Sequence, residues 1–170
     1  YIINTVFNND NLDNEFIFSK DELKDIENIF FNELILDIDT SEDYGGECDD
    51  NIVINKDLLI DEVRINIYLV NPTKSEVKSI LMHELTHVYN NYVMQLKGNK
   101  NFLNTAQSTM YRNIVTPDDD KTIDDIKRVL YFLIGYERNA FIAQLKAELS
   151  KYDNKVKTYL LKYISLAFCP

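Results

Sequence analysis

The chain has 170 residues, of which 45% are apolar and 27% are charged, and its net charge at pH 7 is −10. This composition is typical of one globular domain with a sizeable core, over residues 1–170. The acidic balance argues against nucleic-acid binding, which needs clustered lysine and arginine; a solvated acidic surface is the simplest interpretation. No apolar run reaches the 18 residues of a membrane helix, so we expect no membrane segment.

The chain begins at Tyr1 rather than at Met and stops at Pro170. We therefore expect it to be a piece of a longer protein. No signal-peptide pattern is visible in these residues, but a removed upstream segment would have carried it, so the sequence assigns no compartment. It assigns no oligomeric state either.

A polar, turn-like stretch at 8–15 precedes the first predicted helix. Ser19 and Glu22 have the spacing of a capping box, in which each side chain satisfies a backbone N–H of the other. Apolar residues then recur at helical spacing, so we expect a helix over about 20–34.

The next 36 residues or so favour strands, because they are rich in β-branched residues. The predicted strands are 35–39, 52–60 and 63–70. The last two are expected to form an antiparallel pair, and strand 63–70 alternates apolar and polar residues as a half-buried strand does. Between the strands, 41–51 is expected to be a loop that turns at Gly45 and Gly46.

A second capping box, Thr73 with Glu76, opens a long periodic segment that Gly98 ends. The sequence therefore predicts a helix over about 74–97. Two further helices are expected at about 123–151 and 154–167, which makes the fold class α+β: a small sheet packed on a long helix and C-terminal helices.

The long helix contains ILMHELTH at 80–87, and His83 and His87 are the only histidines of the chain. Residues four apart lie one turn apart on one helical face, so both imidazoles can bind one ion. Glu84 lies about 100° further round the helix, where its carboxylate can take a proton from a metal-activated water. The pattern predicts a catalytic zinc site. The alternative is an amphipathic helix in which the two histidines are ordinary surface or core residues with no metal-binding role.

A catalytic zinc requires a third protein ligand and one open position. No third histidine and no suitably spaced cysteine exists, so the ligand must be a carboxylate. Glu137 is the best candidate because it lies among apolar residues of the segment 135–149, where an unpaired carboxylate is costly. The alternatives are that Glu137 pairs with Arg138 or that Glu148, on nearly the same helical face, is the ligand.

These residues resemble the zincin metallopeptidases of the gluzincin type, and Glu137-Arg138-Asn139-Ala140 is similar to the Glu-x-x-Ala signature of small bacterial and phage zincins. The resemblance implies a zincin-like fold, zinc ligands at His83, His87 and Glu137, and a general base at Glu84. It also implies a protein or peptide substrate laid along strand 63–70 as an edge strand. About 50 residues separate His87 from Glu137, so 99–121 is expected to be an insertion near the cleft.

Peptide hydrolysis also needs a donor that stabilises the oxyanion. Tyr111 and Arg112 are candidates because they lie in the expected insertion. Tyr136 adjoins Glu137 but points elsewhere on the helix.

The leading hypothesis is thus a zinc metalloendopeptidase that hydrolyses peptide bonds. One alternative is a non-catalytic zincin-fold structural or interaction domain of a phage or bacterial assembly. Another is a regulatory peptidase that cleaves one dedicated basic partner, such as a repressor.

Overall fold

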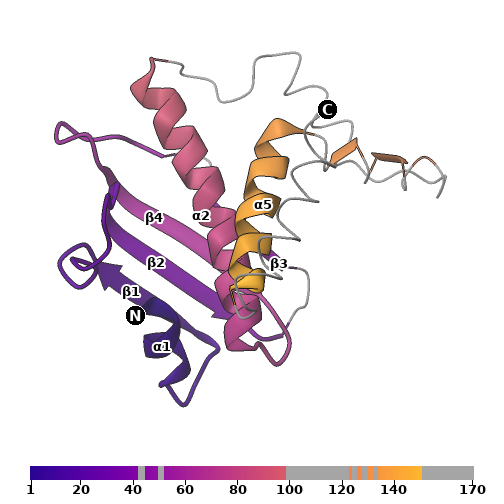
Figure 1. Ribbon diagram of the computed structural model, residues 1–170. Coiled ribbons are helices and arrows are strands. Elements are labelled where there is room, and N and C mark those ends of the chain that lie inside the picture. The colour runs from indigo at the N-terminus through magenta and orange to yellow at the C-terminus, as the bar shows by residue number, and fades with distance from the viewer. Residues whose placement is uncertain are drawn as a thin grey trace.

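The computed structural model describes residues 1–41, 45–49, 52–98 and 134–150, together with the isolated positions 123, 126, 127, 130 and 131. These residues form an α+β fold in which α2 lies across a mixed sheet and α5 packs beside α2 (Figure 1). The elements are α1 (Ile2–Phe7), β1 (Asn14–Ser19), β2 (Phe31–Asp39), β3 (Gly45–Cys48), β4 (Ile60–Tyr68), α2 (Lys74–Leu96) and α5 (Gly135–Leu149). The expected α+β class is therefore confirmed, and the short helix α1 was not predicted.

The four strands lie in the order β1-β2-β4-β3. The central strands β2 and β4 are parallel, with Leu36 opposite Ile65, and both outer strands are antiparallel to their neighbours. The predicted alternation of β4 is confirmed, because Val63, Ile65 and Ile67 are buried in the core. The core thus lies between this sheet and α2.

The helix predicted over 20–34 is wrong. The Ser19–Glu22 box does form, with the Ser19 N–H donating to Glu22 Oε2 over 2.9 Å, but turns follow it and β2 begins at Phe31. Asn28 has a φ of 61°, a left-handed conformation that asparagine tolerates and that interrupts a helix. The apolar residues of 31–38 are buried in a central strand, and this burial outweighs their helical spacing. The predicted strand 35–39 is the second half of β2.

The predicted strand 52–60 and its pairing with 63–70 are also wrong. Within 52–60, Ile54 forms only an isolated bridge with Ile60, and a turn held by the Asn55 side chain separates them. The antiparallel partner of β4 is instead β3, in the segment expected to be a loop. Asn66 and Tyr68 hold β3 in place by donating hydrogen bonds to Glu47 Oε1 over 3.1 and 2.8 Å.

The long helix α2 is confirmed with nearly the predicted bounds. Thr73 caps it, since the Glu76 N–H donates to Thr73 Oγ1 and the Thr73 N–H donates to Glu76 Oε2 over 2.9 Å. Gly98, with a φ of 79°, ends it in a conformation that favours glycine. Because the apolar face of α2 packs on the sheet, the histidine motif is carried by a helix that is anchored in the core.

The predicted helix over 123–151 is interrupted at Ile134. The backbone of Ile134 is extended, with a ψ of 124°, and α5 begins at the next residue, Gly135. Before this break, the described positions 123, 126, 127, 130 and 131 are helical. The predicted helix over 154–167 lies outside the described residues. None of the described helices combines the length and apolarity needed to cross a membrane.

Candidate metal centre

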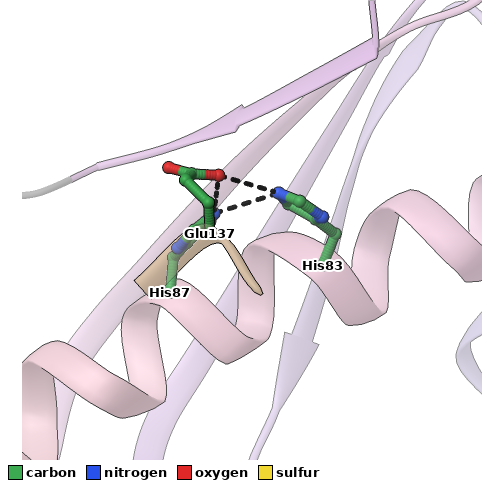
Figure 2. Close-up of side chains that lie close together, drawn as sticks. All are labelled: His83, His87 and Glu137. Atoms are coloured by element: carbon green, nitrogen blue, oxygen red, sulfur yellow. Dashed lines mark hydrogen bonds and ion pairs between the residues drawn. The ribbon is translucent and has the colours of Figure 1, made fainter. Parts of the chain in front are cut away.

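Three side chains from two helices converge on one buried point (Figure 2). His83 and His87 project from successive turns of α2, and Glu137 reaches them from the first turn of α5. The two Nε2 atoms are 3.0 Å apart, and Glu137 Oε2 lies 3.7 Å from Nε2 of His83 and 3.4 Å from Nε2 of His87. These side chains form a group that can hold a metal ion.

The separations match the coordination shell of a small cation. Donors placed 2.0–2.1 Å from a tetrahedral ion are about 3.3–3.4 Å from one another, and the three observed distances bracket that value. Glu137 is only 1% exposed, and the contacts of its Oε2 with the two imidazole nitrogens are too long or too poorly directed to be good hydrogen bonds. An unsatisfied buried carboxylate oxygen is costly, so the donor set itself favours a cation between these atoms.

The charge state of Glu137 also suits a ligand. Burial by itself raises the pKa of this carboxyl, but interactions with His83, His87 and the Tyr131 hydroxyl outweigh it and lower the pKa to about 2. Glu137 is therefore an anion at neutral pH, which is the form that binds a cation. The expected alternative, that Glu137 serves only to pair with Arg138, does not describe this geometry.

Glu84 lies next to the cluster without belonging to it. Its side chain is only 6% exposed, and burial raises its pKa, although electrostatic interactions with His83 and His87 and a hydrogen bond from the Cys48 thiol oppose the rise. A carboxyl with a raised pKa beside side chains that can hold a metal ion is suited to accept and return a proton. This is the position expected of a general base.

The edge strand β3 packs directly against this part of α2. A Cβ at Gly46 would overlap Cγ2 of Ile80 and lie 3.3 Å from Cγ of Glu84, so only glycine permits the observed approach. The strand beside the site is thus β3, and the expectation that 63–70 is the edge strand is wrong, because β4 lies between β2 and β3.

Further contacts surround the histidines. Nδ1 of His83 faces Oε1 of Gln144 at 3.1 Å, and the ring of Phe141 meets the His83 ring edge-on at 4.7 Å between centroids. Tyr131 forms a hydrogen bond with Glu137. The sequence reasoning missed Gln144, although its position seven residues after Glu137 places it two turns along on the same face of α5.

The other candidates are not part of the cluster or lie outside the described residues. Glu148 contacts Gln144 over 3.3 Å and is absent from the group of metal-binding atoms found among the described residues. Tyr111 and Arg112 lie outside the described residues, as does the expected insertion, and the side chain of Tyr136 is not described.

Comparison of this chain with protein-family models, with curated proteins and with solved structures gives no match. The functional conclusion therefore depends on the geometry of the site: two imidazoles and a carboxylate that can hold a metal ion, with a second buried carboxylate beside them.

Proposed function

We propose that this protein is a zinc-dependent metallopeptidase of the zincin type. His83, His87 and Glu137 are its zinc ligands, and Glu84 is its general base. The observation that carries the proposal is the convergence of three donor atoms within 4.8 Å of one another on a buried point next to Glu84. The resemblance of the motif at 83–87 to the zincin signature supports the same assignment.

Zinc is the ion that this donor set suits best. Two neutral imidazoles and one carboxylate, with room for a fourth ligand, form the ligand pattern of catalytic zinc sites. Calcium and magnesium prefer shells built from oxygen atoms. Non-haem iron shares the two-histidine, one-carboxylate set, but the one-turn His-Glu-x-x-His spacing on a single helix favours zinc.

A zinc ion held there supplies Lewis-acid polarisation of a carbonyl and lowers the pKa of a water molecule. The protein's own part in the reaction is proton transfer. A carboxylate oxygen of Glu84 takes the proton of the attacking water and delivers it to the amine nitrogen as the C–N bond breaks. Burial of Glu84 and its hydrogen bond from Cys48 hold that carboxylate against the site.

The edge strand β3 provides a place for an extended substrate. It pairs on one side with β4, and none of the described residues forms a strand on its other side. A peptide added along its other side would be held by main-chain hydrogen bonds next to Glu84. This proposal replaces strand 63–70 with residues 45–48 as the substrate-binding strand.

The metal site is tested by zinc content. Protein purified without added metal is analysed by mass spectrometry for the native chain, Glu137→Ala and the matched control Glu27→Ala, in which an exposed glutamate outside the site is removed. We expect about one zinc per chain for the native protein and the control. Glu137→Ala is expected to lose most of it. An absence of zinc from the native chain, even after zinc is offered, would refute the proposal.

The peptidase activity is tested with Glu84→Gln, which preserves shape but cannot accept a proton. Both proteins are incubated with casein as an unstructured substrate, and the products are identified by mass spectrometry. We expect cleavage by the native chain and none by Glu84→Gln, with equal zinc content in both. If the native chain holds zinc but does not cleave casein, a peptidase of broad specificity is refuted. The non-catalytic domain and the regulatory peptidase with one dedicated partner are then the remaining accounts.

A further inference from the structure

A hydrogen-bonded chain of side chains runs from the candidate metal centre along α5. Nδ1 of His83, the ring nitrogen that does not face Glu137, lies 3.1 Å from Oε1 of Gln144 (Figure 2 shows the two ring nitrogens). The amide nitrogen of Gln144 in turn donates to Oε1 of Glu148 over 3.3 Å and lies 3.5 Å from Oγ of Ser79. All three of these side-chain hydrogen bonds are partly buried.

The order of donors and acceptors in this chain follows from Glu148. An ionised carboxylate only accepts hydrogen bonds, so the Gln144 amide must turn its nitrogen toward Glu148. Its carbonyl oxygen then faces Nδ1 of His83. Since that oxygen can only accept, Nδ1 of His83 must carry the proton.

The tautomer matters because a metal binds the nitrogen that lacks a proton. With the proton on Nδ1, neutral His83 presents the lone pair of Nε2 to the point where His87 and Glu137 converge. The opposite tautomer would place a proton at that point and would have to rearrange before zinc could bind.

We propose that Gln144 is a positioning residue that selects the metal-binding tautomer of His83, and that Glu148 fixes the orientation of Gln144. The proposal rests on the metal site proposed above and gives Glu148 a role other than that of a ligand. One helix thus supplies both a ligand, Glu137, and the group that prepares another ligand, two turns further on.

The first experiment measures the zinc dissociation constant by competition with a chromophoric chelator. Gln144→Leu keeps the size of the side chain but removes the acceptor, and we expect 10- to 100-fold weaker zinc binding, as for other outer-shell partners of metal ligands. The matched control is Gln95→Leu on α2, whose amide donates to the Ile52 carbonyl oxygen over 3.1 Å, away from the site. Zinc binding by the control is expected to equal that of the native chain.

A variant that exchanges the two side chains keeps this test independent of folding. The pair Gln144→Glu with Glu148→Gln preserves the net charge, again places an acceptor against His83, and allows the new amide to donate to the new carboxylate. We expect zinc affinity within a few-fold of the native value. If the exchanged protein folds normally but binds zinc as weakly as Gln144→Leu, the positioning role is refuted.

The tautomer itself can be read by nitrogen-15 NMR of the imidazole rings, which is direct because the chain has only two histidines. In the zinc-free native protein we expect the His83 proton on Nδ1, and in Gln144→Leu a mixture of tautomers. A native His83 with its proton on Nε2 would overturn the inference. This readout needs no bound zinc, so a failure of the positioning proposal is distinguishable from a failure of the metal site.

Discussion

The two buried faces of α2 are built on different principles. The face toward the sheet is apolar, with Val77, Leu81 and Val88 packed into the core. The face toward α5 carries buried polar groups, among them Ser79, His83 and His87. One face lowers the free energy of the folded state by excluding water from apolar surface, whereas the other places polar atoms where water cannot reach them, at a cost.

This difference indicates which contacts stabilise the fold and which serve a site. Apolar contacts are non-directional, so many side chains of similar size would fill the sheet-facing side. The contacts toward α5 depend on individual atoms, since His83 meets Gln144 through one ring nitrogen and Glu137 through the other. We therefore expect changes on the first face to alter folding, and changes on the second face to alter zinc binding.

The largest effect is expected from His87→Ala. A structural zinc contributes an apparent binding free energy of about 10–16 kcal/mol. Because His87 is one of three protein ligands, its loss should reduce the zinc-binding free energy by about a third, on the order of 3–5 kcal/mol. Zinc affinity should then fall about a hundredfold to a few thousandfold. Chelator competition measures this directly, and an unchanged dissociation constant would show that His87 is not a ligand.

The sheet-facing side is tested by Leu81→Ala, at a side chain that is only 4% exposed. Truncation of a buried leucine costs about 2–5 kcal/mol of unfolding free energy, measured by urea denaturation of the zinc-free protein. Zinc affinity of the folded variant is expected to stay at the native value. The control is Leu96→Ala at the exposed end of α2, which is expected to lower the unfolding free energy by less than about 0.5 kcal/mol. A large loss of zinc affinity in Leu81→Ala would contradict the separation of the two faces.

Gly46→Ala tests the contact between β3 and α2. The added methyl group would overlap Ile80 and approach Glu84, so the strand must shift, at a cost of about 1–3 kcal/mol of unfolding free energy. Because the clash is with Ile80, the double variant with Ile80→Ala should be less destabilised than the sum of the two single variants. Additive effects in urea denaturation would show that β3 does not need this close approach.

The smallest effect is expected from Thr73→Ala, which removes the cap of α2 and touches neither face. The loss should be about 1 kcal/mol of unfolding free energy at neutral pH, with zinc affinity unchanged. Hydrogen bonds from the Thr73 side chain and backbone lower the pKa of Glu76 below its usual 4.5. The stabilisation from an ionised Glu76 is therefore complete above about pH 4.5 and is lost as the pH falls through the lowered value.

Urea denaturation between pH 7 and pH 3 measures this dependence. The difference between the native chain and Thr73→Ala should shrink toward acid pH, and a difference that grows on acidification would contradict the assigned capping box.

The two capping boxes show how far local sequence signals reach. Ser19–Glu22 and Thr73–Glu76 form the same side-chain hydrogen bonds, with Oγ to Oε2 distances of 2.8 and 2.6 Å. Only the second is followed by a helix, whereas turns follow the first until the central strand β2 begins at Phe31. A capping box therefore predicts the local turn, whereas the fate of the following residues depends on what they pack against.

The sequence by itself determined α2 and the pairing of its two histidines. Capping, helical spacing, the terminal glycine and the one-turn motif all lie within about 26 consecutive residues, and interactions of this range are set by the local chain. The sequence also showed which residues of β4 face the core, because successive side chains of a strand point to opposite faces and apolar and polar residues therefore alternate.

The tertiary structure decided the rest. It placed β3 against Glu84 and joined Gln144 to His83 across 61 positions of the sequence. It also brought to the histidines Glu137, which the sequence favoured over Glu148 without excluding the latter. These features depend on directional contacts between residues far apart in the chain. Their geometry depends on how the sheet, α2 and α5 pack together, which no local sequence signal specifies.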